Sequence, residues 1–281
     1  MEAPSSLVLM AKAMTEREFS KLSELVTAEL GIKLPPSKKT MLQARLQKRL
    51  RVLGLTSYGD YCEYLFNAEG LQAERPFLYD VVTTNTTHFF REPKHFEILT
   101  AKVLPRLSVL GRRLRFWSAG CSTGEEPYTL SMVLMEHAAQ HPGFDFEILA
   151  TDISTRVLEH GMRAIYPMDK LSGIPKVLMS RYLLRSKDRK LAQAKMGPEL
   201  RKKIQFRRLN FMEEFSLQHK RDVIFCRNVV IYFDRSTQQV LFTKFCQQLN
   251  FGGFLFIGHS ESLNGMDLPL EQVAPTVYRR I

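Results

Sequence analysis

Residues 114–128 read LRFWSAGCSTGEEPY, and this stretch is predicted to pass from a strand through a loop into a helix. Its first six residues form a short apolar run of the kind that makes a buried strand, and a loop with Gly120 and Gly124 follows. Glycine lets the backbone turn tightly and approach a ligand without side-chain obstruction. A strand that leads through such a loop into a helix is typical of a doubly wound α/β sheet, which binds ligands beyond the carboxyl ends of its strands.

More apolar runs of this kind follow, separated by longer segments with helical character. They are FEILATD (146–152), IQFRRLN (204–210), DVIFCRN (222–228) and FLFIGHS (254–260). This alternation predicts a parallel sheet with helices on both faces. The C-terminal VAPTVYRRI (273–281) is predicted as a last strand, which Pro275 separates from the preceding chain.

The segment between the second and third runs, about residues 162–203, is too long for one helix. It contains RYLLRSKDRKLAQAK (181–195) and LRKKIQF (200–206), which we interpret as short antiparallel strands with a Ser-Lys-Asp-Arg turn. The sequence therefore predicts a small, very basic β-subdomain inserted into the main sheet domain, which spans residues 112–281.

An all-helical domain is predicted over residues 1–84. In TEREFSKLSELVTAELG (15–31), Thr15 and Glu18 have capping-box spacing and Gly31 stands where a helix ends. A second helix follows Pro35 and Pro36, and two more are expected near residues 57–67 and 71–84. A linker and a connecting helix, residues 85–111, then lead into the sheet domain.

One face of the second helix is strongly basic. Leucines form one stripe along SKKTMLQARLQKRLRVLG (37–54), and Lys38, Arg45, Lys48 and Arg49 crowd another. Such a face is most often simply solvated, but a run of basic residues without an acidic residue among them also suits a docking surface.

The composition is that of a globular protein with a basic surface. The 281 residues are 44% hydrophobic and 25% charged, and the formal net charge is +11 at pH 7. This charge favours an acidic partner, which could be nucleic acid, an anionic membrane or an acidic protein. No apolar run reaches the roughly 20 residues that a membrane span needs, and MEAPSSLVLMAKAM is no convincing secretion signal. We therefore expect a cytoplasmic protein without membrane insertion.

Four cysteines lie far apart in the sequence, at Cys62, Cys121, Cys226 and Cys246. None forms a C-x-x-C pair, so the spacing favours free thiols over a zinc site or a disulfide framework. No metal is expected. Because no internal repeat demands an assembly, a monomer is the default expectation.

Polar residues follow the strands at the edge where ligands bind. Glu125 and Glu126 come after the first strand, where they would repel a pyrophosphate and favour a cationic ligand. The same loop lacks the middle glycine of the dinucleotide motif, which disfavours a dehydrogenase. Asp152 ends the second strand, and its carboxylate can accept both hydroxyls of a ribose or cap the following helix.

The next two strand ends extend this pattern. Asn210 and Phe211 offer an amide and an aromatic ring, which can meet the edge and the face of an adenine. Arg227, Asn228 and Tyr232 follow the fourth strand. Polar groups at four consecutive strand ends suit a nucleoside that carries an amino group and a sulfonium. The ligand that fits is S-adenosylmethionine (SAM), bound to a class I methyltransferase fold.

The chain resembles the bacterial chemotaxis receptor methyltransferases, the CheR family, from about residue 15 to its end. The resemblance rests on NTTHFFRE (85–92), SAGCSTGEEPY (118–128), ATDIS (150–154) and FCRNVVIYFD (225–234), in this order and after a basic helical module. It implies transfer of a methyl group from SAM to glutamate side chains on the cytoplasmic helical bundle of chemoreceptors. The products are a glutamyl methyl ester and S-adenosylhomocysteine.

The resemblance also assigns roles to single residues. Residues 85–92 are expected to fold over SAM, and Arg91 to orient a carboxylate, either that of the receptor glutamate or that of SAM itself. Tyr232 is expected near the methyl group. The expected SAM contacts are Asn85, Thr87, Arg91, Glu125 (amino end), Asp152 (ribose), Asn210 and Phe211 (adenine), Arg227 and Asn228.

Other residues in these motifs are expected to be structural. Phe89 and Phe90 are interpreted as packing residues, and Trp117 and Cys121 as buried. The histidines His88, His95 and His259 are not expected to be catalytic, because a lone histidine is more often structural or merely exposed. A glutamate is already ionised at neutral pH, so the reaction needs no general base.

The resemblance further implies two contacts with the receptor. The basic face of residues 38–51 would meet the acidic methylation region. In some family members the inserted subdomain binds a C-terminal receptor peptide and carries a Gly-x-Gly element. This chain has Ser186, Lys187, Asp188 and Arg189 there, so we expect an enzyme that needs no tether.

Two alternatives remain. The net charge of +11 is compatible with an RNA methyltransferase, although no aromatic-lined basic groove is visible and residues 228–232 do not match the Asn-Pro-Pro-Tyr type motif. The other alternative is a SAM-binding, receptor-docking module without turnover.

Overall fold

The computed structural model describes residues 12–188 and 190–281, and the chain divides into two compact units between Thr83 and Thr84. The first unit contains the helices α1 (Glu16–Leu30), α2 (Lys39–Leu53), α3 (Tyr58–Leu65) and α4 (Ala68–Val82), with a 3-10 turn η1 (Pro36–Lys38) before α2. Thr15 and Glu18 form the predicted capping box of α1. Helix α4 begins earlier than predicted because the Asn67 side chain caps it.

Leucine and aromatic side chains make the core of this helical unit. They recur at helical spacing, which puts them on one face of each helix and away from water. The buried members include Phe19, Leu22, Val26, Leu42, Leu46, Leu50, Tyr61 and Leu65.

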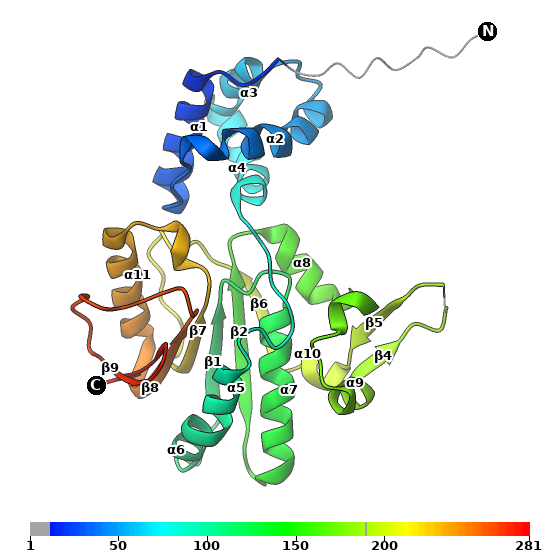
Figure 1. The fold of residues 1–281 in the computed structure, drawn as a ribbon, viewed down its shortest axis with the longest axis vertical. Helices are drawn as coiled ribbons and strands as arrows, with labels where there is room; N and C mark the ends of the chain where they lie inside the picture. The colour runs from blue at the N-terminus through cyan, green and yellow to red at the C-terminus, as the bar shows by residue number, and fades with distance from the viewer. Residues whose placement is uncertain (1–11, 189) are drawn as a thin grey trace. The chain divides into compact units, whose positions relative to one another are not determined.

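A seven-stranded sheet with the order β6-β2-β1-β7-β8-β10-β9 forms the second unit (Figure 1). Its strands are β1 (Leu114–Ala119), β2 (Phe146–Asp152), β6 (Ile204–Arg208), β7 (Arg221–Cys226), β8 (Leu249–Ile257), β9 (Leu270–Ala274) and β10 (Val277–Arg280). The strands from β6 to β8 are parallel, and β10 is antiparallel to both of its neighbours. The predicted doubly wound α/β sheet is confirmed.

The prediction of a single last strand is incomplete. Residues 270–280 form a hairpin, and its first strand, β9, was missed. This strand lies at the sheet edge and none of its residues is buried, so it lacks the apolar pattern that marks the inner strands. Pro275 does interrupt the chain between the two strands, as predicted.

Alternation along the strands divides the core between the two faces of the sheet. Phe116 and Phe225 face helices α5 (Lys94–Ile98), α6 (Leu104–Ser108) and α7 (Glu125–Gln140), with the π-helical turn η2 (Leu99–Val103) between α5 and α6. Trp117 and Ile224 face α11 (Arg235–Gln248) on the other side. Because the sheet is covered on both faces, its central strands consist almost entirely of buried residues.

The remaining elements belong to the inserted region and its surroundings. Helix α8 (Thr155–Arg163) follows β2, and a three-stranded antiparallel sheet has the order β3-β5-β4. The elements after α8 are β3 (Ile165–Pro167), η3 (Met168–Leu171), α9 (Lys176–Tyr182), β4 (Leu183–Arg185), β5 (Gln193–Met196) and α10 (Pro198–Arg201), and η4 (Val230–Tyr232) follows β7. The predicted antiparallel subdomain is present, but residues 200–206 are not one of its strands. They end helix α10, which Pro198 starts, and then enter β6 of the main sheet.

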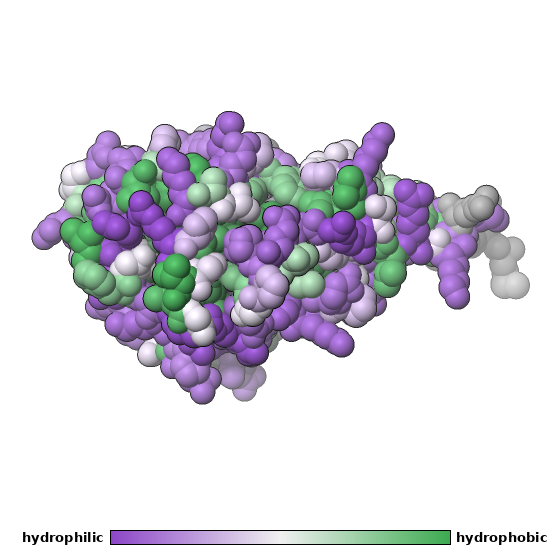
Figure 2. Space-filling model, turned by 90° about the horizontal axis from the view of Figure 1, so that it is seen from below, coloured by the Kyte–Doolittle hydropathy of each residue, from purple (hydrophilic) through white to green (hydrophobic). Residues whose placement is uncertain are grey.

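All four cysteines are buried and free, and Trp117 is fully buried, as predicted. On the face in Figure 2, apolar residues lie in small groups among hydrophilic ones. No helix in the described part of the chain has the length and the apolar composition that crossing a membrane requires.

Candidate active site

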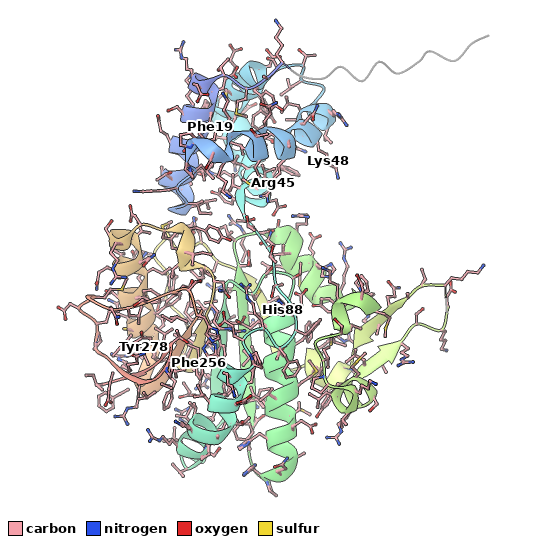
Figure 3. All side chains as sticks on the ribbon, viewed as in Figure 1. Phe19, Arg45, Lys48, His88, Phe256 and Tyr278 are labelled. Carbon is pink, nitrogen blue, oxygen red and sulfur yellow. The ribbon has the colours of Figure 1, made fainter. Side chains whose placement is uncertain are left out.

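Residues 85–92 run along the carboxyl ends of the parallel strands, where Figure 3 marks them by His88. The Ser122 hydroxyl, in the loop after β1, donates a hydrogen bond to the Asn85 carbonyl (3.0 Å). At the end of β7, Arg227 donates through Nη1 to the Arg91 carbonyl (2.7 Å). These bonds hold the segment against the edge where this class of sheet binds ligands.

The two phenylalanines of this segment are packing residues, as predicted. Phe89 is buried and meets Tyr166 edge to face, with ring centroids 5.0 Å apart. Phe90 packs against Phe96 of the main core, and its backbone N–H donates to the Thr129 hydroxyl. The rings therefore anchor the segment, and its polar residues remain for a ligand.

The two glutamates after the glycine loop have different partners. Glu126 accepts a hydrogen bond from Ser118 (2.6 Å) and pairs with Arg227 (2.7 Å). Glu125 is buried and accepts the Thr123 hydroxyl (2.6 Å), and no lysine or arginine in the described part of the chain pairs with it. A buried carboxylate without a cation is costly, so Glu125 suits the cationic ligand that the sequence predicts.

Arg227 is the centre of a buried polar network. Its guanidinium pairs with Glu126, donates to the Arg91 carbonyl, and lies 3.5 Å from Glu92 and 3.2 Å from Nδ1 of His95. Every one of these contacts is internal to the protein. The predicted contact of Arg227 with SAM stays a prediction, whereas its role in joining residues 91–95 to the sheet is directly visible.

Glu92, His95 and His259 place three potential metal-ligand atoms within 4.8 Å of one another. Burial, followed by the charge of Arg227, lowers the pKa of His95 to about 4, so its ring is neutral at pH 7. Nδ1 accepts from Arg227, which leaves the Nε2–H to donate to the Thr276 hydroxyl (2.7 Å). A permanently charged guanidinium therefore already lies against two of the three groups, and the cluster does not fit a metal ion.

Asp152 lies at the end of β2 with 8% of its surface exposed. One carboxylate oxygen accepts the backbone N–H of Ser122 (2.9 Å), and the other accepts that of Ser154 (3.0 Å). These two bonds orient the Asp152 carboxylate at the end of β2, where the sequence predicts the ribose contact.

Asn210 and Phe211 follow β6. The amide oxygen of Asn210 accepts the backbone N–H of Met212 (3.0 Å). The ring of Phe211 packs edge-on against Trp117 and Phe245 in the core. The packed ring of Phe211 therefore fixes the loop to the core. The predicted adenine contact would be made by the loop and not by an unpacked aromatic ring.

Asn228 has a positive φ of 59° at the end of β7. Its side-chain oxygen Oδ1 is buried and has no hydrogen-bond partner among the described residues. Buried polar atoms normally have a partner, so this acceptor fits a ligand with a donor group, such as the amino group of SAM. Tyr232 lies four residues further on, with 36% of its surface exposed.

Arg91 and Thr87 are partly exposed. The Arg91 guanidinium donates through Nη1 to the carbonyl of Thr86 (3.0 Å), which leaves further N–H groups for a carboxylate. The backbone of Arg91 is held by Arg227, so the side chain projects from a fixed position.

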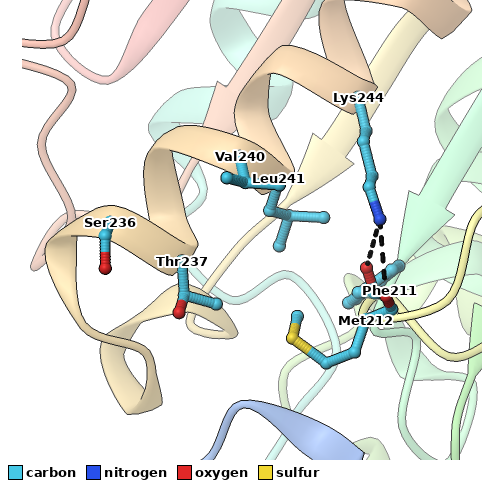
Figure 4. Close-up of a pocket in the computed structure, with 7 residues that line it drawn as sticks. All are labelled: Phe211, Met212, Ser236, Thr237, Val240, Leu241 and Lys244. Atoms are coloured by element: carbon cyan, nitrogen blue, oxygen red, sulfur yellow. Dashed lines mark hydrogen bonds between the residues drawn. The ribbon is translucent and has the colours of Figure 1, made fainter.

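A pocket of about 240 Å³ lies between α11 and the loop after β6 (Figure 4). It is lined by Phe211, Met212, Ser236, Thr237, Val240, Leu241 and Lys244. The Lys244 ammonium donates to the carbonyls of Phe211 and Met212, both at 3.5 Å, and to that of Glu213 at 3.0 Å. Lys244 therefore holds the loop that is expected to meet the adenine.

The four basic residues predicted to dock the receptor differ in their surroundings. Arg45 donates to the carbonyls of Val81 and Thr83, and Arg49 forms two hydrogen bonds with Glu74, at 2.9 and 2.6 Å. Both hold α2 against α4, Arg45 at the end of α4 and Arg49 at its middle. Lys38 and Lys48 are exposed, as is Arg51, which ends the predicted basic face of residues 38–51.

Ser186, Lys187 and Asp188 lie in the connection between β4 and β5, and all of them carry exposed or partly exposed side chains. Arg189, the fourth residue of this predicted turn, lies outside the described residues.

The sequence prediction missed Glu92 and Glu261. Each accepts backbone N–H groups from the ends of other strands, Glu92 from His259 and Glu261 from Asn228, Val229, Val230 and Gly258. For Glu261 the available signal was its position directly after the run FLFIGHS (254–260).

Two family models match consecutive parts of the chain. "CheR methyltransferase, all-alpha domain" matches residues 17–83, and "CheR methyltransferase, SAM binding domain" matches residues 85–279.

Several curated proteins are similar over nearly the whole chain. A "Chemotaxis protein methyltransferase" of Borreliella burgdorferi is 40% identical over 274 residues, which cover 95% of each chain. "Chemotaxis protein methyltransferase 2" of Pseudomonas aeruginosa is 37% identical, over 94% of this chain and 93% of that protein. A "Chemotaxis protein methyltransferase" of Escherichia coli is 35% identical, over 95% of this chain and 91% of that protein.

Proposed function

Because the chain belongs to the CheR methyltransferase family, we propose that it transfers the methyl group of SAM to glutamate side chains of chemoreceptors and so produces glutamyl methyl esters. The observation that carries this proposal is similarity over the whole chain to proteins named chemotaxis protein methyltransferases. The predicted fold and cofactor agree with the family, which has an all-α domain followed by a SAM-binding domain.

The residues at the strand ends suit the parts of SAM. We assign Glu125 and the unpaired Oδ1 of Asn228 to the amino end, and Asp152 to the ribose. The loop of Asn210 and Phe211 takes the adenine. Asn85 and Thr87 complete the site from residues 85–92, which lie over it. Arg227 lines the site and holds these residues against the sheet.

When bound, SAM supplies an electrophilic methyl group on a sulfonium. The attacking glutamate is ionised at neutral pH, with a reference pKa of about 4.3, so the protein needs no general base. Its task is to exclude water and to align the carboxylate with the methyl carbon, opposite the sulfur. Arg91 orients a carboxylate through its planar guanidinium, and Tyr232 lines the reaction centre.

Two expected features of substrate binding complete the proposal. The exposed basic residues of α2 meet the acidic methylation region of the receptor, and no receptor tail is needed. The tail proposal is tested by titrating a peptide that ends in an aromatic pentapeptide, because micromolar binding to the full-length protein would contradict it. We further propose that the enzyme acts as a cytoplasmic monomer without nucleic acid.

The deciding experiment uses methyl-labelled SAM and membranes rich in chemoreceptor. We expect label on the receptor that mild alkali releases as methanol, because methyl esters hydrolyse where methylated amines do not. Arg91→Ala should remove at least about 90% of this label, since it removes the group that orients a carboxylate.

Binding of S-adenosylhomocysteine to the same variant tells which carboxylate Arg91 holds. Unchanged affinity assigns Arg91 to the receptor glutamate, and weakened affinity assigns it to the carboxylate of SAM. Label on added RNA instead of on receptor would contradict the proposal and favour the RNA methyltransferase that the +11 charge allows. Tight cofactor binding with no product in a single turnover would indicate a docking module.

A further inference from the structure

The turn after β7 directs consecutive backbone N–H groups at one buried carboxylate, that of Glu261. Oε1 accepts from Val229 and Val230, both at 2.9 Å. Oε2 accepts from Asn228 at 3.0 Å and from Gly258 at 2.6 Å. Consecutive N–H groups next to a residue with positive φ form an anion-binding concavity, and here the anion comes from the chain itself.

These bonds join the end of β7, which carries part of the site, to the end of its neighbour β8. Asn228 belongs to the end of β7, and Gly258 to the end of β8. A Cβ at Gly258 would lie 2.9 Å from the backbone nitrogen of Asn228, so the close approach of the two backbones requires glycine at this position. Few residues other than glycine adopt the left-handed conformation of Asn228, although asparagine does so more readily than most, and the bonds to Glu261 hold the turn in it.

We propose that Glu261 is a positioning residue of the methyltransferase, which presets the turn from Asn228 to Tyr232 and so aims Asn228 at the cofactor. Each carboxylate oxygen of Glu261 accepts two of the four N–H groups, so Glu261 has no acceptor capacity left for a ligand. Glu261 therefore affects cofactor binding only through the turn from Asn228 to Tyr232. The inference rests on the SAM site of the proposed function, and not on the identity of the methyl acceptor.

The negative charge is essential to this arrangement. In Glu261→Gln one oxygen becomes an NH₂ group, which donates and would face two backbone N–H groups. Those N–H groups would be left buried without an acceptor. Glu261→Asp keeps both oxygens but retracts them by one methylene, so it should preserve part of the function. Glu271, which is exposed on β9 and pairs with Arg279, provides the matched control Glu271→Gln.

The test measures the affinity of the full-length protein for S-adenosylhomocysteine by calorimetry. We expect Glu261→Gln to weaken binding about tenfold, Glu261→Asp to lie between this variant and wild type, and Glu271→Gln to bind as wild type. If Glu261 acts through Asn228, then Glu261→Gln should add almost nothing to the loss caused by Asn228→Ala, whereas independent effects would multiply.

Thermal unfolding of the same variants separates positioning from stability. Wild-type affinity in Glu261→Gln, multiplying effects in the double variant, or loss of folding in both Glu261 variants would each overturn the proposal. The readout needs no methyl acceptor, so it stays decisive if the receptor assignment fails. A wild-type protein that binds no S-adenosylhomocysteine would contradict the SAM site itself.

Discussion

Lys48 and Arg49 are neighbours in the sequence, and yet they have opposite surroundings in the helical unit. Lys48 is exposed, whereas Arg49 pairs with Glu74, a carboxylate whose side chain is fully buried. The hydrogen bonds that Arg49 donates to Glu74 raise the pKa of Arg49, and its guanidinium also stacks on the ring of Phe77 at 3.5 Å. The basic face predicted from the sequence therefore contains both docking candidates and structural residues.

These two roles predict different results for charge variants. The double variant Lys38→Glu, Lys48→Glu should lower kcat/KM for receptor methylation about tenfold at low salt and change the free energy of unfolding by less than about 0.5 kcal/mol. Lys102→Glu, an exposed position in the other unit, is the control. Equal activity of the double variant and the control would exclude this face from docking.

Arg49→Met should instead destabilise the helical unit. It leaves Glu74 buried without its partner, which costs about 3–5 kcal/mol when a buried ion pair is broken. Urea unfolding of the full-length protein measures this loss, and Lys48→Met is the matched control. A variant as stable as wild type would show that Glu74 finds another partner.

At the scale of single elements, the start of α7 depends on Gly124. This residue has a φ of 99°, and a Cβ there would lie 2.8 Å from the hydroxyl of Tyr166 and 3.0 Å from Cα of Gly161. Tyr166 is buried and donates to the carbonyl of Thr123. A methyl group at this position must therefore shift either the inserted region or the first turn of α7, which carries Glu125.

Gly124→Ala should weaken S-adenosylhomocysteine binding at least about tenfold, because a shift of about 1 Å at a binding group is enough for a large loss. Gly54→Ala is the matched control. Gly54 also has a positive φ, of 69°, but no atom lies within 4 Å of its Cβ position. This control should lose only about 1 kcal/mol of stability and no affinity. Equal affinities for the two variants would contradict the steric explanation.

At the scale of the whole molecule, buried histidines determine how the protein responds to acid. The pKa of His95 falls to about 4 through burial and the nearby Arg227, against about 6.5 in an unfolded chain. Between these pH values His95 is protonated in the unfolded chain but not in the folded protein. The free energy of unfolding therefore decreases as the pH falls from about 6.5 to 4. Burial, then the charge of His141, lowers the pKa of His137 and adds to this loss.

The carboxylate of Asp145 acts below this window. Hydrogen bonds from Lys203, then Arg113, hold the pKa of Asp145 at about 2, so its contribution is lost only below about pH 4. We therefore expect the melting temperature to fall between pH 6.5 and 4, and His95→Gln to flatten this fall, because glutamine takes up no proton in either state. The exposed His219→Gln is the control. An unchanged pH profile for His95→Gln would contradict the assignment.

The order of strands and helices could be predicted because its signals are local. Apolar runs, caps and glycines act on neighbouring residues, so Thr15, Gly31 and the strand LRFWSA identify their elements without tertiary information. Strand β9 was not predicted because an exposed edge strand needs no apolar pattern. The family was equally accessible, since SAGCSTGEEPY and FCRNVVIYFD are long enough to be specific.

The fold class, the family and the cofactor thus follow from the sequence, whereas only the folded structure shows which charged groups are partners. Arg227 and Glu92 are 135 positions apart, and Arg49 and Glu74 are 25 apart. His95 lies in this network with Arg227, and not alone as its sequence position suggested. An ion pair depends on distance through space and on burial, and residue spacing along the chain encodes neither of them.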